Sequence, residues 1–319
     1  MQLIRGIHNL RPLHHGCVLT IGNFDGVHLG HRAVLRQLQQ KAQDLGLPAC
    51  VMLFEPQPLE LFGDQQAPAR LSRLRDKYQA LQRMGMDRLL CVRFSAAFAA
   101  MEPEQFIRRV LVEQLGVRYL VIGDDFCFGR GRRGDFAMLQ AAGREFGFEV
   151  VTTASFCLAG ERVSSTRLRE ALRLGQMDAV SEMLGQPYAL TGRVAHGAKL
   201  GRTIGFPTAN LHLKRRVVPV SGVYATEVLC SGHLYYGVAN IGTRPTVNGQ
   251  RPQLEVHIFD FSGDLYGKQL CVRLCHKLRD ERKFESFAAL QAQIREDAQA
   301  ARHFFGLAAT PIDANGTQD

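Results

Sequence analysis

Short apolar runs alternate with amphipathic stretches along the first half of the chain. The apolar runs predict buried strands at residues 17–22, 49–54, 88–94, 119–123 and 148–154. Between them, apolar residues recur at helical spacing and predict helices at residues 31–45, 70–84, 103–115 and 135–146. Strands that alternate with helices form a parallel sheet with helices on both faces, so this half predicts an α/β domain.

The pattern changes near Gly185-Gln-Pro-Tyr188. Beyond it, short alternating runs separated by turn signals predict strands at residues 223–229, 234–240, 254–261 and 270–278. An amphipathic stretch with apolar positions from Phe287 to Phe305 predicts one closing helix. This second half is typical of an antiparallel sheet or small barrel.

The change of pattern sets the predicted domain boundary. A chain of 319 residues is long enough for about two domains. We expect the first domain to cover residues 1–185 and the second to cover 186–308. The polar end of the chain, residues 309–319, is expected to be disordered.

Composition places the chain among ordinary globular proteins, with 46% hydrophobic and 22% charged residues. The longest apolar run falls short of the roughly 20 residues that span a bilayer, and the first residues do not resemble a signal peptide. Eight scattered cysteines indicate buried free thiols in a reducing compartment. We therefore expect a cytoplasmic protein with no membrane partner. The net charge of +9 fits a nucleic-acid binder or an enzyme with anionic substrates equally well.

The segment Thr20-Ile-Gly-Asn-Phe-Asp-Gly-Val-His-Leu-Gly-His31 joins a predicted strand to a predicted helix. Residues three apart on a helix share a face, so His28 and His31 lie together at the helix start. The unpaired N–H groups of that first turn suit a phosphate, and two imidazoles add donors for it. The alternative is a glycine-containing turn with two ordinary surface histidines.

A second helix start follows the last predicted strand of the first half. Ser164-Ser-Thr-Arg-Leu-Arg169 supplies a cap, hydroxyl donors and an arginine about one turn later. Together these groups would form a second anion-binding helix start. Taken alone, the segment favours a plain capped helix with a surface arginine.

Two features of the second half suggest chemistry. Pro207 is followed by Thr208 and Asn210, whose hydroxyl and amide oxygens are hard ligands that suit Mg²⁺ beside a phosphate. Glu255 interrupts the apolar strand pattern of Leu254 and Val256, although strands disfavour glutamate. On the pattern alone, Glu255 is a solvent-facing position and the polar residues after Pro207 satisfy a turn.

Several motifs of the first half resemble the adenylyltransferase module of bacterial bifunctional riboflavin kinase/FAD synthetases. These are Gly22-Asn-Phe-Asp-Gly-Val-His-Leu-Gly-His31, Phe54-Glu-Pro-Gln-Pro58, Gly123-Asp-Asp-Phe-Cys-Phe-Gly129 and Ser164-Ser-Thr-Arg-Leu-Arg169. The resemblance implies a Rossmann-like nucleotidyltransferase domain. In it, the FMN phosphate attacks the α-phosphorus of ATP and pyrophosphate leaves, without a covalent enzyme intermediate.

The same resemblance implies roles for individual residues. His28 and His31 would be catalytic. The implied ATP-binding residues are Gly22, Asn23, Phe24, Asp25, Ser165, Thr166 and Arg169. The implied flavin-binding residues are Phe62, Asp124, Phe126 and Phe128. Gln57 stands where some relatives carry histidine, so we assign it no role.

Motifs of the second half resemble the riboflavin kinase module, a six-stranded Greek-key barrel. They are Gly192-Arg-Val-Ala-His-Gly197, Phe206-Pro-Thr-Ala-Asn210, Asn240-Ile-Gly-Thr-Arg244 and Leu254-Glu-Val-His-Ile258. The resemblance implies that Thr208 and Asn210 bind Mg²⁺ and nucleotide, and that Glu255 accepts the proton of the ribityl 5′-hydroxyl. It also implies an ATP loop and a flavin-binding segment, which contain Gly197, Lys199, Gly201, Arg279, Asp280 and Arg282.

The sequence thus predicts a bifunctional enzyme that phosphorylates riboflavin to FMN with ATP and Mg²⁺ and then adenylates FMN to FAD. Its partners would be flavins and ATP, with no nucleic acid, and we expect a monomer or weak homo-oligomer. One alternative is an adenylyltransferase for another phosphorylated acceptor. Another is an RNA-binding protein, because His28-Leu-Gly-His31 also resembles class I aminoacyl-tRNA synthetases. Against the second, no Lys-Met-Ser-Lys-Ser segment exists.

Overall fold

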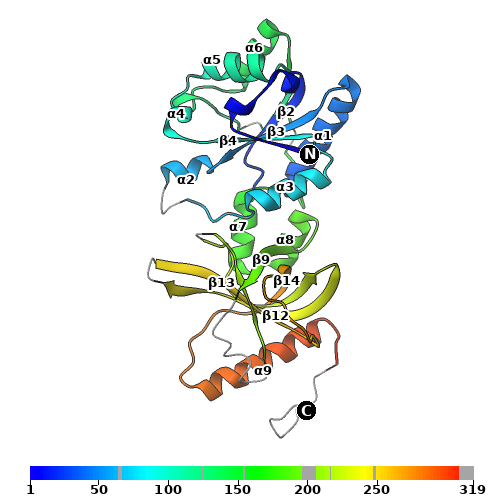
Figure 1. Cartoon of the computed structure of the whole chain (residues 1–319), viewed down its shortest axis with the longest axis vertical. Coiled ribbons are helices and arrows are strands. Elements are labelled where there is room, and N and C mark those ends of the chain that lie inside the picture. The colour runs from blue at the N-terminus through cyan, green and yellow to red at the C-terminus, as the bar shows by residue number, and fades with distance from the viewer. Residues whose placement is uncertain are drawn as a thin grey trace. The chain divides into compact units, whose positions relative to one another are not determined.

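The computed structural model describes residues 1–63, 67–123, 125–153, 155–195, 206–215, 217–246 and 249–308 (Figure 1). The chain forms two compact units, Met1–Ser165 and Thr166–Asp319. Four residues that the sequence singles out lie outside the described residues: Asp124, Gly197, Lys199 and Gly201. The predicted disordered tail at 309–319 also lies outside them.

A parallel sheet of six strands forms the centre of the first unit. Its strands are β1 (Gln2–Arg5), β2 (Cys17–Ile21), β3 (Ala49–Glu55), β4 (Arg88–Arg93), β5 (Val117–Ile122) and β6 (Glu149–Thr152). They lie in the order β1-β4-β3-β2-β5-β6, and all neighbouring pairs are parallel. The prediction of a parallel α/β domain is confirmed.

Helices and turns connect these strands. They are η1 (Ile7–Asn9), η2 (Pro12–His14), α1 (Leu29–Leu45), α2 (Pro58–Phe62), α3 (Leu74–Arg83), α4 (Ala96–Ala99), α5 (Pro103–Gln105), η4 (Phe106–Gln114), η5 (Arg130–Arg132) and α6 (Phe136–Phe146). A small hairpin of β7 (Cys157–Leu158) and β8 (Glu161–Arg162) closes the unit. The predicted helix at 103–115 is present, but most of it has π-helical hydrogen bonding.

The sheet is buried on both faces, which explains its continuous apolar runs. Val18 and Leu19 are both fully buried, yet they belong to two different hydrophobic clusters. Successive side chains of a strand point to opposite faces, so one cluster lies on each side of the sheet. The carboxyl ends of the strands are where such folds bind ligands.

The second unit is a closed antiparallel barrel with helices at both ends of its sequence. It contains α7 (Ser165–Leu174), α8 (Met177–Leu184), β9 (Tyr188–Ala195), β10 (Ala209–His212), β11 (Gly222–Cys230), β12 (His233–Thr246), β13 (Gly249–Ile258), β14 (Gln269–Arg279) and α9 (Phe287–Phe304). The strands close in the order β10-β13-β12-β11-β14-β9. The six-stranded barrel and the terminal helix are therefore confirmed.

The helix α9 packs on the barrel through small residues. Ala298 and Ala301 are buried in one cluster with Val223, Val238 and Phe259 of the barrel. Ser286 caps the helix by accepting from the Ala289 N–H at 3.2 Å. This explains the helical spacing of the last apolar positions.

Two further features concern the predicted buried free thiols and the lengths of the helices. All eight cysteines are free, as predicted, but Cys157 on the β7–β8 hairpin is exposed and three others are only half-buried. A two-stranded hairpin has too little packed surface to cover Cys157. Among the helices that the structure describes, none is long and apolar enough to cross a membrane.

Candidate active sites

The start of α1 brings the two motif histidines into contact. His28 is the N-cap residue, and its Nδ1 accepts a hydrogen bond from the His31 N–H at 3.3 Å. The two rings stack with centroids 3.7 Å apart and an interplanar angle of 16°. The loop before them is bent, because Phe24 and Val27 have positive φ values of 47° and 43°. Such backbone conformations are costly and concentrate at functional sites.

One ring nitrogen of His31 is buried and has no hydrogen-bond partner. Its Nδ1 atom is buried without a hydrogen bond, and so is the Oδ1 atom of Asn23 in the same loop. Burial, and then the charges of His28 and Lys77, lower the pKa of His31 well below its ordinary value of 6.5. The imidazole is therefore neutral at pH 7, and one of its nitrogens can donate to a phosphate oxygen.

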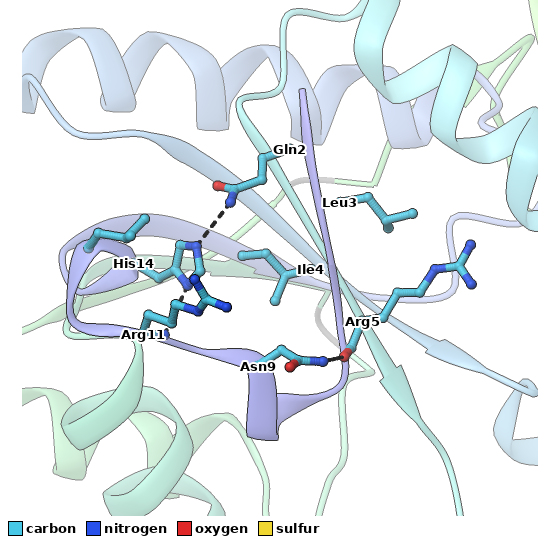
Figure 2. Close-up of a pocket in the computed structure, with 8 residues that line it drawn as sticks. Gln2, Leu3, Ile4, Arg5, Asn9, Arg11 and His14 are labelled. Carbon is cyan, nitrogen blue, oxygen red and sulfur yellow. Dashed lines mark hydrogen bonds between the residues drawn. The ribbon is translucent and has the colours of Figure 1, made fainter.

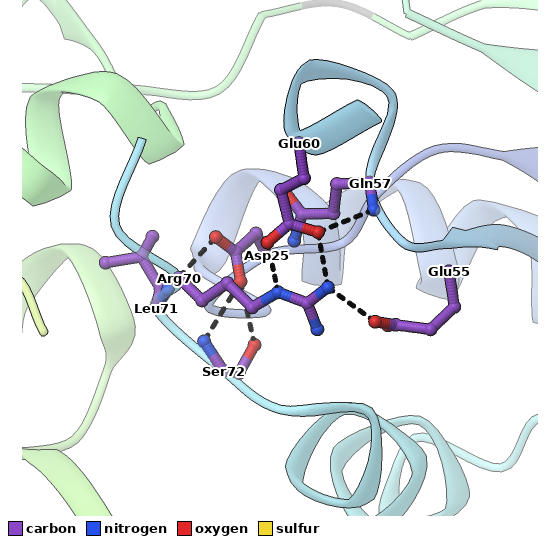
Figure 3. Close-up of polar contacts among 7 residues, drawn as sticks. All are labelled: Asp25, Glu55, Gln57, Glu60, Arg70, Leu71 and Ser72. Atoms are coloured by element: carbon purple, nitrogen blue, oxygen red, sulfur yellow. Dashed lines mark hydrogen bonds and ion pairs between the residues drawn. The ribbon is translucent and has the colours of Figure 1, made fainter. Parts of the chain in front are cut away.

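The Asp25 carboxylate holds the loop between β2 and α1 in place. Its carboxylate is almost fully buried and accepts from the N–H groups of Leu71 at 3.0 Å and Ser72 at 2.9 Å (Figure 3). Ser72 Oγ in turn accepts from the Gly26 N–H at 2.9 Å. These bonds fix the loop to the segment before α3. Phe24 is buried as well and packs its ring 5.0 Å from that of His31.

The second predicted helix start lies beside this loop. Ser165 Oγ donates to the backbone oxygen of Asp25 at 2.9 Å. The Val163 carbonyl lies 3.3 Å from where a Cβ on Gly30 would sit, so only a small residue fits at position 30. The structure thus brings Ser165 to the loop between β2 and α1, residues 22–28, as the sequence predicted. We call this segment the histidine loop. Thr166 and Arg169 follow on α7, in the second unit.

An arginine that the sequence analysis did not identify ties two carboxylates together. Arg70 pairs with Glu55, the last residue of β3, at 2.5 Å, and with Glu60 of α2 (Figure 3). Glu60 also accepts from the Gln57 N–H at 2.8 Å. Burial acts to raise the pKa of Glu60, but the Arg70 and Gln57 donors outweigh it and lower the pKa. Gln57 Nε2 is buried without a partner.

A row of aromatic rings leads away from α2. Phe62 is 68% exposed and meets Phe94 edge-on at 5.9 Å. The row continues through rings that touch in turn: Phe94, Phe54, Phe98, Phe106, Phe128 and Phe126. An exposed aromatic ring beside the sheet suits a flat, apolar ligand. Phe128, in contrast, is 8% exposed and belongs to the core.

In the barrel, two predicted site residues face each other across strands. Asn210 on β10 pairs in register with Glu255 on β13, which pairs in register with Asn240 on β12. Gln253 donates to the Asn210 side chain and to Glu255 Oε1, the latter at 3.1 Å. Leu254 and Val256 are fully buried, so the polar row lies on the outer face of the barrel.

A histidine fixes the segment that leads into β10. His257 Nδ1 donates to the Pro207 carbonyl at 2.9 Å, and its ring meets Phe206 at 5.2 Å. Burial lowers the pKa of His257. His257 lies two residues after Glu255 and therefore on the same strand face. Thr208, next to Pro207, is exposed.

The three residues predicted to bind flavin at the end of β14 differ in their surroundings. Arg279 is engaged by Asp297 of α9, with Nε 2.8 Å from Oδ1 and Nη2 2.7 Å from Oδ2. Asp280 pairs with Lys277 at 2.6 Å, and this pairing lowers the pKa of Asp280. Arg282 lies over the ring of Phe284 at 5.0 Å. The Arg279 guanidinium is thus an anchor for this segment.

A cavity of about 400 Å³ follows the edge strand β1 (Figure 2). Its wall includes Arg5, Asn9, Arg11 and His14, with Gln2 and the His14 ring joined at 3.1 Å. It contains no residue that the sequence analysis assigned to a site. A second cavity, of about 650 Å³, reaches Pro48 and Asp87, at the opposite end of the strands from the histidine loop.

Two family models match the chain. The FAD synthetase model matches residues 10–167, and the riboflavin kinase model matches residues 184–305. The fold and these matches define the class: a flavin-nucleotide enzyme in which a nucleotidyltransferase-type unit precedes a kinase barrel.

Curated relatives match over nearly their whole length. The bifunctional riboflavin kinase/FMN adenylyltransferase of Escherichia coli (strain K12) is 56% identical over 309 residues, which cover 96% of this chain and 99% of the relative. The protein of the same name from Haemophilus influenzae is 54% identical over 306 residues, with coverages of 96% and 99%. The chain belongs to the bifunctional riboflavin kinase/FMN adenylyltransferase family, as its motifs predicted.

A solved structure shares the fold of both units. The crystal structure of a macrolide-efflux protein from Streptococcus pneumoniae has a TM-score of 0.82 and 30% identity, and the match covers 95% of this chain and 99% of that one. A parallel-sheet unit followed by a barrel unit therefore has an experimental counterpart that covers nearly the whole chain.

Proposed function

We propose that the two activities of this family, riboflavin kinase and FMN adenylyltransferase, are divided between the barrel and the parallel-sheet unit of this chain. The enzyme phosphorylates riboflavin to FMN with ATP and adenylates FMN to FAD. The observation that carries the division is that each unit has its own polar cluster. One is the His28–His31 stack at the start of α1, and the other is the Asn210–Glu255 pair on the barrel.

In the parallel-sheet unit, the start of α1 receives the phosphates of ATP. The N–H groups and the dipole of the first turn attract the anion, and His28 and the neutral imidazole of His31 donate to oxygens on which charge grows. A phosphate oxygen of FMN attacks the α-phosphorus, the bond to pyrophosphate breaks, and no side chain becomes covalently modified. The protein contributes positioning and charge stabilisation.

The residues around the histidine loop bind different parts of the two substrates. Asn23 and Ser165 bind ATP directly, whereas Asp25 keeps the loop in its bent path. Thr166 and Arg169 bind the departing pyrophosphate. Phe62, the exposed end of the aromatic row, stacks on the flavin ring, and Asp124 and Phe126 line the flavin site.

In the barrel, Glu255 accepts the proton of the ribityl 5′-hydroxyl as that oxygen attacks the γ-phosphorus of ATP, the bond from the γ-phosphorus to the bridging oxygen breaks, and ADP leaves. Such general-base help supplies a factor of about 10² to 10⁴. Gln253 orients Glu255 through a 3.1 Å hydrogen bond. Arg279 positions the segment that carries Asp280 and Arg282 over the flavin.

The residues before and on β10 fit Mg²⁺. Thr208 stands directly before β10, and Asn210 pairs in register with Glu255, so the Asn210 amide lies on the same strand face as the Glu255 carboxylate. These are hard oxygen ligands, and Mg²⁺ commonly combines one or two of them with water and substrate phosphates. Bound there with ATP, the ion would neutralise charge on the phosphate groups.

Two substitutions test the division in the purified full chain. With riboflavin, ATP and Mg²⁺ supplied, Glu255→Gln should abolish FMN formation and leave the conversion of added FMN to FAD intact. His31→Ala should do the reverse. Equal loss of both steps from either substitution, in protein with an unchanged melting temperature, would contradict the proposal. Formation of neither product by the unaltered chain would refute the activity itself.

A further inference from the structure

Lys77 is a lysine with no access to solvent. It lies on α3, and its side chain is 0% exposed. Leu81, one turn later, is also fully buried, so both residues lie on the core face of the helix. The Nζ atom of Lys77 is buried without a hydrogen-bond partner. Lysine is almost never fully buried without a partner, so this side chain requires an explanation.

The surroundings of Lys77 place its ammonium at the catalytic end of the sheet. Side chains on a helix lean toward the helix N-terminus, and Lys77 lies in the first turns of α3. The carboxylates whose charges act on it are those of Asp25 in the histidine loop, Glu55 at the end of β3 and Glu60 on α2. Arg70 is the nearby cation. All of these belong to the parallel-sheet unit.

Most of these carboxylates already have other donors. Asp25 accepts from Leu71 and Ser72, and both oxygens of Glu60 accept from Arg70 (Figure 3). One oxygen of Glu55 also pairs with Arg70. The carboxylates therefore surround Lys77 with negative charge but do not hold its ammonium through their own hydrogen bonds.

Acceptors without donors lie in the same region. In the described part of the parallel-sheet unit, three buried acceptor atoms have no hydrogen bond: Asn23 Oδ1, His31 Nδ1 and Glu55 Oε2. His31 and Glu55 are both within electrostatic range of Lys77. A buried ammonium without a hydrogen-bond partner thus lies within electrostatic range of two residues, His31 and Glu55, that each carry a buried atom able to accept a hydrogen bond.

Retaining this lysine opposes stability. An apolar side chain would suit a face shared with Leu81, and burial of an incompletely paired ammonium disfavours folding. Burial also lowers the pKa of Lys77. A charged residue at a buried position where an apolar residue would be more stable is typical of a functional position.

We propose that Lys77 is a positioning residue for adenylyl transfer, whose ammonium lies on the Nδ1 side of His31 and keeps the ring proton on Nε2, the nitrogen that meets a phosphate oxygen. The inference rests on the proposed role of His31. His28 stacks on the face of that ring, and Asp25, Glu55, Glu60 and Arg70 are charged groups that act on Lys77. The lysine acts through the histidine and touches no reacting atom.

The test removes the charge of Lys77 and keeps the approximate shape of its side chain. Lys77→Met removes the ammonium, and Leu81→Met is the matched control on the same face without a change of charge. Both variants are assayed in the full chain for FMN-to-FAD conversion, with riboflavin phosphorylation as the internal control. Lys77→Met should lower kcat/KM for FMN adenylylation about a hundredfold. Riboflavin phosphorylation and the melting temperature of the unit should not fall.

A spectroscopic readout separates positioning from packing. Nitrogen-15 labelling of the histidines reports the tautomer and pKa of His31. In Lys77→Met, the Nε2–H tautomer should lose its predominance and the pKa of His31 should rise, so the acid limb of the adenylylation profile moves to higher pH. Lys77→Gln, which keeps a polar side chain, should show the same shift if the methionine variant does not fold.

Three results would overturn the inference. One is normal adenylylation by Lys77→Met. Another is an unchanged His31 tautomer in either variant. The third is a loss of activity that parallels a fall in melting temperature and also appears in Leu81→Met. If His31→Ala itself retains full adenylylation, the proposed function of the histidine loop fails first, which distinguishes the two failures.

Discussion

Asn210 and Glu255 lie directly opposite each other on antiparallel strands, and one amide side chain bridges them. Gln253 donates to the Asn210 side chain and, at 3.1 Å, to Glu255 Oε1. Gln253 and Glu255 are two residues apart and share a strand face. The bridge fixes the proposed general base and the proposed metal-binding amide relative to each other.

Gln253→Leu should therefore slow riboflavin phosphorylation without removing any group that reacts. Loss of the bridge frees the Glu255 carboxylate to leave its catalytic orientation, so we expect kcat to fall about tenfold. FMN adenylylation is measured in the same samples and should not change. Unaltered phosphorylation in Gln253→Leu would mean that strand pairing alone orients Glu255.

Phe62 and Phe128 offer a comparison between binding and packing. Phe62 is 68% exposed, whereas Phe128 is buried in the core at 8%. Phe62→Ala should raise the KM for FMN about five- to tenfold through lost stacking, with little change in melting temperature. Phe128→Ala should instead destabilise the parallel-sheet unit by about 3 kcal/mol or more. Steady-state kinetics and calorimetry on both variants check this contrast, and an unchanged KM in Phe62→Ala would place the flavin elsewhere.

Much of the fold could be predicted because its strands are buried on both faces. The runs at 17–22, 49–54 and 88–94 match β2, β3 and β4 to within a residue. The edge strand β1 was missed because it has four residues and only Ile4 is buried. β10 was missed for a similar reason, since four residues with two buried positions carry no clear period.

The sequence also predicted those site residues that lie close together along the chain. His28 and His31 meet because three positions make nearly one helical turn. The sequence did not predict Arg70, Lys77 or Gln253, because each acts through partners on other elements. Only the pairing of β10 with β13 or the packing of α3 on the sheet brings those partners near.

The lowered pKa of His31 predicts how stability depends on pH. Burial, with the charges of His28 and Lys77, disfavours its protonated form in the folded unit. Between the folded pKa and 6.5, the unfolded chain therefore binds more protons, and stability falls as pH drops below about 6.5. His31→Gln should flatten this part of the profile for the parallel-sheet unit.

Calorimetry between about pH 5 and pH 7 measures the effect. His8→Gln, which replaces an exposed histidine of the same unit, is the control and should leave the slope as it is. An equal slope in His31→Gln and the unaltered chain would show that this imidazole is not held neutral by the fold.

The pairing of Arg279 with Asp297 predicts a link between α9 and riboflavin binding. Asp297 is 6% exposed and accepts three hydrogen bonds from the Arg279 guanidinium, while Arg279 Nη1 donates to the Asp280 carbonyl at 2.9 Å. Asp297→Asn weakens this anchor and should lower the stability of the barrel unit by about 1–3 kcal/mol. Because the segment after β14 loses its tether, the KM for riboflavin should rise several-fold.

A second ion pair of α9 provides the control for this last prediction. Arg302 Nη2 donates to Asp260 at 2.6 Å, away from the segment that follows β14. Asp260→Asn should loosen the same helix without raising the KM for riboflavin, because no bond from Arg302 reaches Asp280. If both variants raise that KM equally, α9 acts on the barrel as a whole. If Asp297→Asn lowers stability and leaves the KM unchanged, Arg279 does not position the flavin-binding segment, and Asp280 and Arg282 must be ordered by contacts of their own.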